Sequence, residues 1–179
     1  FSTYEEMLNC EEIDIINICT PSGTHAPLII EAAKAHKNII VEKPMAMSID
    51  DANLMIETAK KNNVKLSVAH QNRFNKPIQK LREAVEEEKL GRIMNGTARI
   101  LWRRDDNYYK QAPWRGTWDL DGGTLMNQCI HNIDLMQWMI GSEVERVYAE
   151  CDTYRNNIEG EDFGAILVRF KNGAIGIIE

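Results

Sequence analysis

The 179-residue sequence lacks several features that would assign it to a specialised class of protein. No apolar run approaches the ~18–20 residues that a membrane-spanning helix needs. Basic residues are in deficit, with 21 Lys and Arg against 27 Asp and Glu, which argues against a nucleic-acid-binding module. The four cysteines show no C-x-x-C spacing, which favours free thiols in a reducing compartment over a disulfide framework or a zinc site. We therefore expect a cytoplasmic protein with no nucleic-acid partner, no membrane partner and no bound metal.

Residues 1–72 alternate short apolar strands with helical patterns. The predicted strands and helices are, in order, residues 14–20, 26–36, 38–42, 48–59 and 64–69. Ser48 and Asp51 form a capping-box-like pair at the start of the second helix. Because residues 38–42 are nearly all apolar, we expect that strand to be buried on both faces, as in a parallel sheet. The order of elements indicates an α/β fold, the second half of a Rossmann-type doubly wound parallel sheet.

Residues 73–179 follow a different pattern, with longer strands and a hairpin signal. The predicted elements are a helix at 77–91, a strand at 93–102, a helix at 124–140, and strands at 146–154, 163–170 and 174–178. The Lys-Asn-Gly turn at residues 171–173 is typical of a β-hairpin, so we expect an α+β domain with a mostly antiparallel sheet. Alternation along residues 147–152 predicts a sheet with one covered face and one face that is exposed or turned toward another subunit. We therefore expect a homo-oligomer.

The sequence begins within a helical pattern and ends on a strand. No strand precedes the first strand–helix pattern, and the second sheet stops at its last strand. We therefore expect both folds to be incomplete in this chain, as in a piece of a longer protein.

Polar and charged side chains follow the strands of the predicted parallel sheet. In open parallel sheets ligands bind beyond the carboxyl ends of the strands, which here selects residues 20–25, 42–45 and 70–73. Lys43 lies between an apolar strand and Pro44, which fixes the turn and permits a cis peptide bond. A lysine held in a cleft donates to a hydroxyl or a carbonyl, whereas a surface lysine has no such role, and the sequence leaves both interpretations open. The helix that begins at this edge points its first N–H groups toward it, which suits a phosphate.

Three polar residues share one face of the helix predicted at residues 124–140. Asn127, His131 and Asp134 are spaced i, i+4, i+7 on an otherwise apolar helix. Buried polar groups need partners or a ligand, so this stripe is a candidate site around His131. A purely structural histidine is the alternative. A metal site is the least favoured interpretation, because His131 and Asp134 supply two ligands and the sequence pattern offers no third.

Arginine and aromatic residues are interleaved between residues 102 and 118. Arg103, Arg104 and Arg115 alternate with Trp and Tyr side chains, a combination that suits a planar ring and a charged group on one ligand. The same aromatics would also serve to cover the sheet, and both interpretations stay open. With a net charge of −6, a small anionic ligand is favoured over a polynucleotide.

Three motifs occur in series along the chain. They are TPSGTH at residues 20–25, EKP at 42–44 and GGTLMNQCIHNID at 122–134. Their order and spacing resemble those of the Gfo/Idh/MocA oxidoreductases, the family of glucose–fructose oxidoreductase and inositol dehydrogenase, across essentially the whole chain. Residues 71–75 (QNRFN) and 108–118 (YYKQAPWRGTW) resemble more particularly the branch that oxidises the 3-hydroxyl of UDP-N-acetylglucosamine or its uronate.

The resemblance implies a two-domain enzyme that transfers hydride from a sugar or nucleotide sugar to NAD or NADP. Residues 1–72 would be the C-terminal half of a dinucleotide-binding domain, and residues 73–179 a substrate-binding and oligomerisation domain. The resemblance implies two catalytic residues, Lys43 contacting the nicotinamide ribose and the substrate, and His131 taking the hydroxyl proton. The implied cofactor-binding residues are Thr20, Pro21, Ser22, His25, Glu42, Lys43 and Gln71. The implied substrate-binding residues are Lys43, Arg73, Tyr109, Trp114, Arg115, Asn127 and His131.

The chain departs from the family pattern at three points. Asn127 stands where many members have an aspartate, and Cys129 where many have a glycine. Because an amide does not exchange a proton, the proton relay would run through Lys43 and His131 alone. No G-x-G-x-x-G occurs, nor the acidic residue that reads the ribose, so NAD and NADP both stay open. Two alternative functions remain: a dehydrogenase of a free sugar or inositol on the same fold, and a non-catalytic fragment that only binds or assembles.

Overall fold

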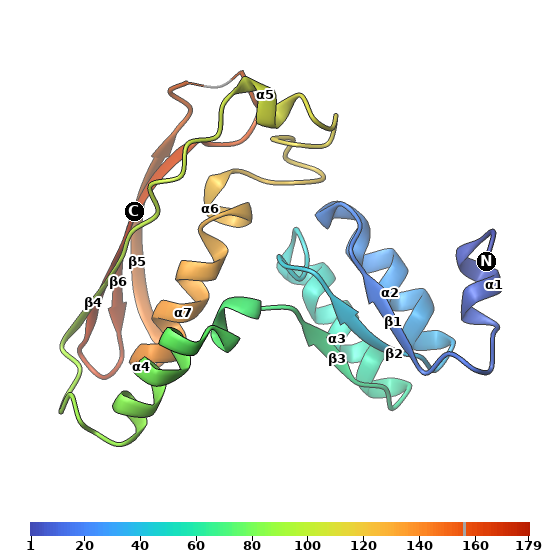
Figure 1. Cartoon of the computed structure of the whole chain (residues 1–179), viewed down its shortest axis with the longest axis horizontal. Coiled ribbons are helices and arrows are strands. Elements are labelled where there is room, and N and C mark those ends of the chain that lie inside the picture. Colours follow the sequence, from blue (N-terminus) through green and yellow to red (C-terminus); the bar gives the residue numbers. More distant parts are fainter. Residues whose placement is uncertain (156) are drawn as a thin grey trace. The chain divides into compact units, whose positions relative to one another are not determined.

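The computed structural model describes residues 1–155 and 157–179, and the chain divides into two compact units (Figure 1). Unit 1 comprises residues 1–69 and 119–121, and unit 2 comprises residues 70–118 and 122–179. In the part of the chain that the structure describes, no helix combines the length and the apolar character that a membrane span requires.

Unit 1 is built around a three-stranded parallel sheet in the order β1-β2-β3. Its elements are α1 (Tyr4–Leu8), β1 (Ile15–Ile18), η1 (Ser22–Thr24), α2 (His25–Lys34), β2 (Asn38–Val41), α3 (Ile49–Lys61) and β3 (Leu66–Val68). Ser48 caps α3, because its hydroxyl oxygen accepts a hydrogen bond from the Asp51 N–H at 3.0 Å. The predicted Rossmann-type order of parallel strands and helices is confirmed.

The sheet of unit 1 is covered on one face only, which corrects the expectation for residues 38–42. Ile39 and Val41 are buried in the core with residues of α2 and α3, whereas Ile40 between them is 42% exposed. Ile15 of β1 is likewise exposed. The cause is topological: both crossovers step in the same direction along the sheet, so right-handed connections put both helices on the same face.

Unit 2 is built on a four-stranded sheet in the order β4-β7-β6-β5. Its elements are η2 (Gln71–Phe74), α4 (Lys76–Glu86), β4 (Asn95–Ala98), α5 (Asp106–Tyr109), α6 (Thr124–Asn127), α7 (Ile130–Ile140), β5 (Val144–Asp152), β6 (Phe163–Phe170) and β7 (Ile175–Ile178). β4 pairs with β7 in parallel, and the β5–β6 and β6–β7 pairs are antiparallel. The predicted α+β domain with a mostly antiparallel sheet is confirmed.

Helices α6 and α7 cover one face of the unit 2 sheet (Figure 1). Met136 and Ile140 of α7 are buried in one core with Val168 and Phe170 of β6. Gly96 in β4 makes room for this helix, because a Cβ there would lie 2.8 Å from the Met136 sulfur. Helix α7, which carries the catalytic candidate His131, is therefore anchored to the sheet by close apolar packing.

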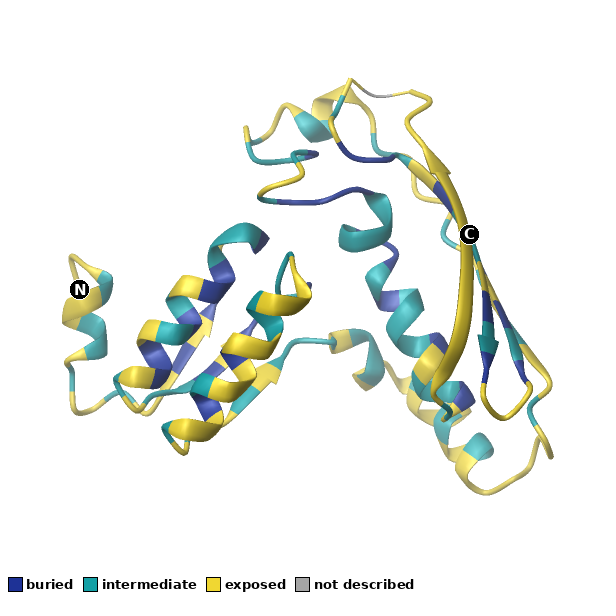
Figure 2. Cartoon of the chain, turned by 180° about the vertical axis from the view of Figure 1, so that it is seen from behind, coloured by how far each residue is buried: buried dark blue, intermediate teal, exposed yellow. Residues whose placement is uncertain are grey.

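The other face of the unit 2 sheet is open, and β5 is exposed along its whole length (Figure 2). Tyr148, Leu167 and Ile177 lie directly opposite one another on three neighbouring strands. Their exposed fractions are 63%, 49% and 44%. The sheet thus has one covered and one open face, but the alternation expected along residues 147–152 is not seen, because β5 is an edge strand whose residues all lie outside the core beneath α6 and α7.

The helix predicted over residues 124–140 is interrupted. The Cys129 N–H donates to the Thr124 carbonyl five residues back, at 2.8 Å, instead of four residues back. This wider, π-type turn separates α6 from α7. Asn127 and His131 therefore lie on two helices, and do not form the single polar stripe on one helix that the spacing predicts. Gly141 closes α7 with a left-handed φ of 65°, as predicted.

Two neighbouring elements are shorter than predicted. α4 ends at Glu86 instead of near Gly91, and the chain leaves the helix through a left-handed residue, Glu88, with φ of 56°. β4 spans residues 95–98 of the predicted 93–102, because its partner β7 pairs with those four residues only.

Candidate active site

Two loops at the carboxyl edge of the unit 1 sheet carry residues predicted to contact the cofactor. Thr20 follows β1 and is exposed, and its hydroxyl lies 2.6 Å from that of Thr24. Glu42 and Lys43 follow β2 and are half-buried, and a Glu42 carboxylate oxygen accepts a hydrogen bond from the Lys43 backbone N–H at 3.2 Å. The Lys43–Pro44 peptide bond is cis. The parallel pairing of β1 and β2 thus brings a hydroxyl, a carboxylate and an ammonium group to one edge of unit 1.

His25 stands at the start of α2 and is completely buried. Its Nδ1 lies 2.9 Å from the carbonyl oxygen of Pro44, and its Nε2 lies 3.0 Å from the carbonyl oxygen of Thr20. The ring therefore contacts the loops that follow both strands, and both of its nitrogens are directed at protein carbonyls.

The turn before α2 does not offer the N–H groups expected for a phosphate. The Gly23 N–H donates to the Leu120 carbonyl at 3.3 Å, and the Thr24 N–H donates to the Pro21 carbonyl at 2.9 Å. Gly23 permits this approach, because a Cβ there would lie 2.0 Å from the Asp119 carbonyl oxygen. No local pattern in the sequence connects residue 23 with residues 119–121, so sequence reasoning missed this contact.

The groups at this edge fit the nicotinamide end of a dinucleotide. Hydroxyl, carboxylate and ammonium side chains supply the donors and acceptors that a ribose and a carboxamide require. Among the other predicted cofactor residues, Pro21 is half-buried, Ser22 is buried, and Gln71 is exposed at the first position of η2 in unit 2. The sequence contains no glycine-rich loop of the kind that cradles a pyrophosphate. The fit thus extends to the ribose and nicotinamide only.

His131 lies in the first turn of α7 and is 8% exposed. It lines a cavity of about 160 Å³ in unit 2, together with Asn72, Trp102 and Gln128. Asn127 ends α6 and is half-buried, and its N–H donates to the Gly123 carbonyl at 3.0 Å. An imidazole at the wall of a small cavity can accept a proton from a hydroxyl that binds there, and this role of His131 stays a prediction.

Gly123, directly before α6, makes room for Glu161. A Cβ on Gly123 would lie 1.7 Å from Glu161 Oε2. Glu161 Oε1 accepts a hydrogen bond from the Leu125 N–H at 2.8 Å, and the Glu161 carbonyl accepts one from the Thr124 N–H at 2.8 Å. The carboxylate satisfies backbone donors that a helix start leaves unpaired. The glycine motif is therefore a packing requirement that fixes the helix carrying Asn127.

The cysteines and acidic residues do not form a metal centre in the described residues. Cys10, Cys19, Cys129 and Cys151 are all free thiols, as predicted. Burial, and secondarily the Glu161 carboxylate, raises the pKa of the Cys129 thiol, so this side chain is a protonated packing residue. Across residues 1–155 and 157–179, no three His, Cys, Asp or Glu side chains gather in a way that would hold a metal ion.

Arg73 of η2 is held by Asp134 of α7. Its Nε donates to Asp134 Oδ2 at 2.7 Å and its Nη2 donates to Oδ1, a bidentate pair. The guanidinium also lies over Trp138, 5.1 Å from the ring centroid, and His70 Nδ1 is 3.7 Å from Asp134 Oδ2. The hydrogen bond with Asp134 raises the pKa of Arg73. Asp134 thus has its partner within the protein, while substrate contact by Arg73 stays a prediction.

The interleaved arginines and aromatics form a continuous cation–π stack in unit 2. Arg104 contacts Trp102 and Tyr108, with its Cζ 5.2 and 4.6 Å from the two ring centroids. Arg115 contacts Tyr108 and Trp114, at 4.3 and 4.7 Å. The stack orders two guanidinium groups, a combination that suits a planar, anionic ligand.

Tyr108 is the central residue of the stack, next to the predicted Tyr109, which it meets edge-on at 5.1 Å. Its hydroxyl accepts a hydrogen bond from Arg115 Nη1 at 2.6 Å and lies 3.3 Å from Gln128 Nε2. Gln128 also lines the cavity beside His131. Tyr108 and Gln128 therefore connect the loop to that cavity, and nothing in the sequence distinguishes Tyr108 from its neighbour.

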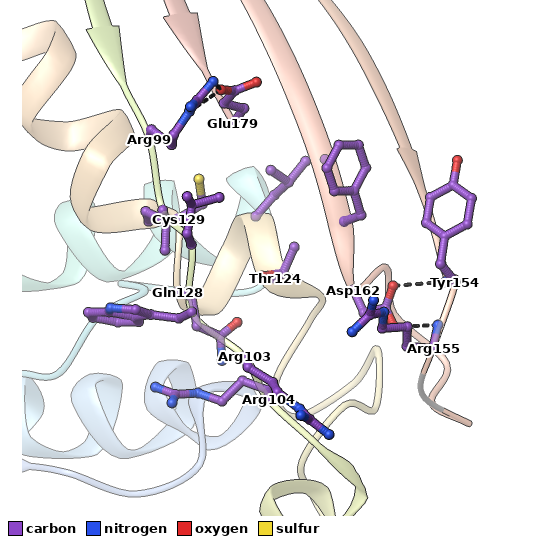
Figure 3. A pocket seen from close by; sticks show the side chains of 16 residues that line it. Arg99, Arg103, Arg104, Thr124, Gln128, Cys129, Tyr154, Arg155, Asp162 and Glu179 are labelled. Atoms are coloured by element: carbon purple, nitrogen blue, oxygen red, sulfur yellow. Dashed lines mark hydrogen bonds and ion pairs between the residues drawn. The ribbon is translucent and has the colours of Figure 1, made fainter.

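A larger cavity of about 820 Å³ lies in unit 2 between residues 99–104 and the start of β6 (Figure 3). β7 pairs with β4 at residues 95–98 and with β6 at residues 166–169, so both walls run on past the last residue of β7. The cavity therefore lies beyond the last residue of β7, between the segments that continue from the two flanking strands.

Comparisons with known proteins define the class of both units. Residues 1–70 match the oxidoreductase family with an NAD-binding Rossmann fold, and residues 78–179 match the Gfo/Idh/MocA C-terminal domain. The chain belongs to the Gfo/Idh/MocA family of oxidoreductases. The resemblance drawn from the three sequence motifs is thereby confirmed.

Three relatives illustrate what the chain is similar to. The WlbA dehydrogenase of Bordetella pertussis, crystallised with NADH and UDP-GlcNAcA, is 40% identical with a TM-score of 0.94, over 99% of this chain and 55% of that chain. The myo-inositol 2-dehydrogenase of Thermotoga maritima is 30% identical over 97% of this chain and 51% of its own length. The levoglucosan dehydrogenase of Pseudarthrobacter phenanthrenivorans is 27% identical over 99% of this chain and 52% of its own length. The chain spans about half the length of the curated relatives it matches.

Proposed function

We propose that the whole protein oxidises a secondary hydroxyl of a sugar to a ketone with NAD or NADP, and that its substrate is a UDP-N-acetylglucosamine-type nucleotide sugar or its uronate, oxidised at C3. The observation that carries this proposal is the 40% identity, along 99% of the chain, to a dehydrogenase crystallised with NADH and UDP-GlcNAcA. The stacked arginines and aromatics of residues 102–115 support it, because a nucleotide sugar presents both a planar base and a diphosphate.

Thr20, Glu42 and Lys43 are proposed to hold the nicotinamide end of the cofactor, with Pro21, Ser22 and Gln71 completing its surroundings and the buried His25 supporting the loops behind them. When bound, NAD or NADP supplies the acceptor for the hydride that leaves the sugar carbon. Glu42 accepts hydrogen bonds from ribose hydroxyls, and the Lys43 ammonium donates to the ribose and to the substrate hydroxyl.

His131 is the proposed general base. As the C–H bond of the sugar carbon breaks with its electron pair, the hydroxyl proton passes to the His131 imidazole and the carbon–oxygen bond becomes a carbonyl. Lys43 stabilises the negative charge that develops on that oxygen. Asn127 orients the hydroxyl but exchanges no proton, and Arg73, Tyr109, Trp114 and Arg115 are proposed to hold the sugar and its anionic groups.

The catalytic assignment is tested by replacing Lys43 with Ala and His131 with Asn in the whole protein. We expect each change to lower kcat by ~10²-fold or more while the circular dichroism spectrum and Tm stay unchanged, because each removes a proton-transfer or charge-stabilising group. Lys65→Ala and His36→Asn are controls, since both residues are exposed and lie near the amino ends of the unit 1 strands, opposite the carboxyl edge that carries Lys43. Near-normal turnover in both catalytic variants would refute the assigned roles.

The substrate is tested by following NAD and NADP reduction with UDP-N-acetylglucosamine, its uronate, free myo-inositol and a free anhydro-sugar. Inositol and levoglucosan dehydrogenases among the relatives make the free substrates the relevant alternative. Saturable turnover with the uronate, and a 3-keto product by mass spectrometry and NMR, is the expected result. Turnover confined to a free cyclitol or sugar would overturn the nucleotide-sugar assignment but leave the oxidoreductase in place.

A further inference from the structure

His25 bridges the two loops that follow β1 and β2. Its side chain comes from α2, is 0% exposed, and meets the Thr20 carbonyl with Nε2 and the Pro44 carbonyl with Nδ1. These two loops carry Thr20 and Lys43, which are proposed to touch the cofactor and the substrate. The ring is thus the buried side-chain contact behind the exposed edge of unit 1.

The chemistry of the ring restricts what it does there. Both carbonyl oxygens are acceptors only, and a neutral imidazole carries one N–H, so it donates to one of the two carbonyls. The His25 side chain has no solvent-exposed surface. It acts on ligands through the backbone that it holds, since both nitrogens are directed inward.

The contact with Pro44 matters most for the site, because Pro44 follows Lys43 directly. The Pro44 residue is itself buried, while the Lys43 side chain is half-buried. At the start of this turn the Glu42 N–H donates to the Ile18 carbonyl at 2.9 Å, and the Lys43 N–H donates to the Glu42 carboxylate at 3.2 Å. A bond from a rigid, fully packed ring to the next carbonyl fixes the direction in which the Lys43 side chain leaves the turn.

We propose that His25 is a positioning residue whose Nδ1–H donates to the Pro44 carbonyl and so holds Lys43 in its working orientation. The proposal rests on the catalytic role proposed above for Lys43 as far as turnover is concerned. The hydrogen bond and its effect on the turn stand independently of that role.

Two substitutions separate the two ring contacts. In His25→Asn the side-chain amide nitrogen falls near the position of Nδ1 and keeps the Pro44 contact. In His25→Gln the amide nitrogen falls near the position of Nε2 and keeps the Thr20 contact instead. Both replacements are polar and of similar size, so a ring that serves only as packing predicts equal effects.

The direct readout is amide hydrogen exchange by mass spectrometry and NMR on the 179-residue chain. We expect the amides of residues 42–46 to exchange roughly tenfold faster in His25→Gln, because this variant loses the hydrogen bond to the Pro44 carbonyl that holds the turn. In His25→Asn, which keeps that bond, we expect exchange close to the original rate. Equal acceleration in the two variants, or acceleration in His25→Asn alone, overturns the proposal.

A second measurement needs no substitution and covers the case in which a variant fails to fold. The ¹⁵N shifts of the His25 ring in the unaltered protein report which nitrogen carries hydrogen. A protonated Nδ1 supports the proposal, and a bare Nδ1 with hydrogen on Nε2 alone overturns it.

Turnover of the whole protein then links the bond to function. We expect His25→Gln to lower kcat by roughly tenfold with little change in the KM of the sugar, and His25→Asn to restore most of the loss. If no sugar or cyclitol is oxidised by the unaltered protein, the proposed function fails while the exchange and ¹⁵N results still decide the role of His25. If oxidation occurs and kcat is the same in both variants, the positioning role is refuted and the proposed function stands.

Discussion

At the residue scale, the glycines of this chain are explained by what approaches them. Gly123 leaves the space that the Glu161 carboxylate occupies, and Gly23 leaves the space that the Asp119 carbonyl occupies. Both contacts join segments that are far apart in sequence. The motifs that contain these glycines signal a family, whereas the physical reason for each glycine is visible only in the folded chain.

Replacing Gly123 with Ala is expected to lower the free energy of unfolding by about 2–4 kcal/mol, because the new methyl group meets a buried carboxylate that cannot move without losing its bond to α6. Chemical denaturation measures the change. Gly91→Ala is the control: nothing lies within 4 Å of its Cβ, so only its left-handed φ of +61° costs stability, about 1 kcal/mol. Equal losses at the two positions would contradict this explanation of the motif.

At the scale of elements, the apolar periodicities predicted most strands and helices, because burial on one face imposes a period of two or 3.6 residues. The interruption between α6 and α7 was not predictable in this way. The Cys129 N–H donates to the Thr124 carbonyl at 2.8 Å, and this interruption leaves no mark on the apolar pattern of the sequence. The exposure of Ile40 was not predicted for a different reason. An apolar strand sequence does not show whether helices of the same chain cover one face of the sheet or both.

Much of the candidate site could be located from the rule that ligands gather at the carboxyl ends of parallel strands. Thr20, Glu42 and Lys43 lie there as expected. The ion pairs and side-chain hydrogen bonds of the site residues could not be predicted, because their partners lie far away in the sequence. Asp134 pairs with Arg73, which is sixty-one positions away in the sequence. The residues that flank each of them in the sequence give no indication of this pair.

The Arg73–Asp134 pair is expected to fasten η2 to α7. A double-mutant cycle with Arg73→Lys and Asp134→Asn is predicted to give a coupling free energy of about 1–2 kcal/mol, because Asp134 is only 12% exposed and the contact is bidentate. Lys80 and Glu83 on α4 form a matched surface pair, with side chains 78% and 54% exposed. That pair is predicted to contribute less than about 0.5 kcal/mol, and a coupling of similar size in the two cycles would contradict the role given to Asp134.

At the scale of the whole molecule, the chain leaves one face of the unit 2 sheet uncovered, as it does one face of the unit 1 sheet. Tyr148, Leu167 and Ile177 form an apolar row across three strands. Monomeric proteins seldom expose such rows. If the protein is a homo-oligomer, as the sequence predicts, we expect this row to lie in the interface between subunits.

Sedimentation velocity tests that expectation. Leu167→Lys is predicted to shift the protein to a smaller species, because it places a charge in the centre of the row. Leu54→Lys on α3 is the matched control, since both leucines are 49% exposed, and it is predicted to leave the mass unchanged. If the unaltered protein is a monomer, or if both variants have the same mass, the row is not an interface between subunits.

The proposed chemistry of the whole protein depends on one transfer: the hydrogen on C3 of a nucleotide sugar leaves as hydride and arrives on the nicotinamide ring. The most direct test supplies the whole protein with UDP-N-acetylglucosamine uronate deuterated at C3 and examines the reduced cofactor by mass spectrometry and NMR. The proposal predicts one deuterium on the nicotinamide ring and a 3-keto sugar in equal amount. Reduced cofactor without deuterium, or no reduction by any nucleotide sugar, would contradict it.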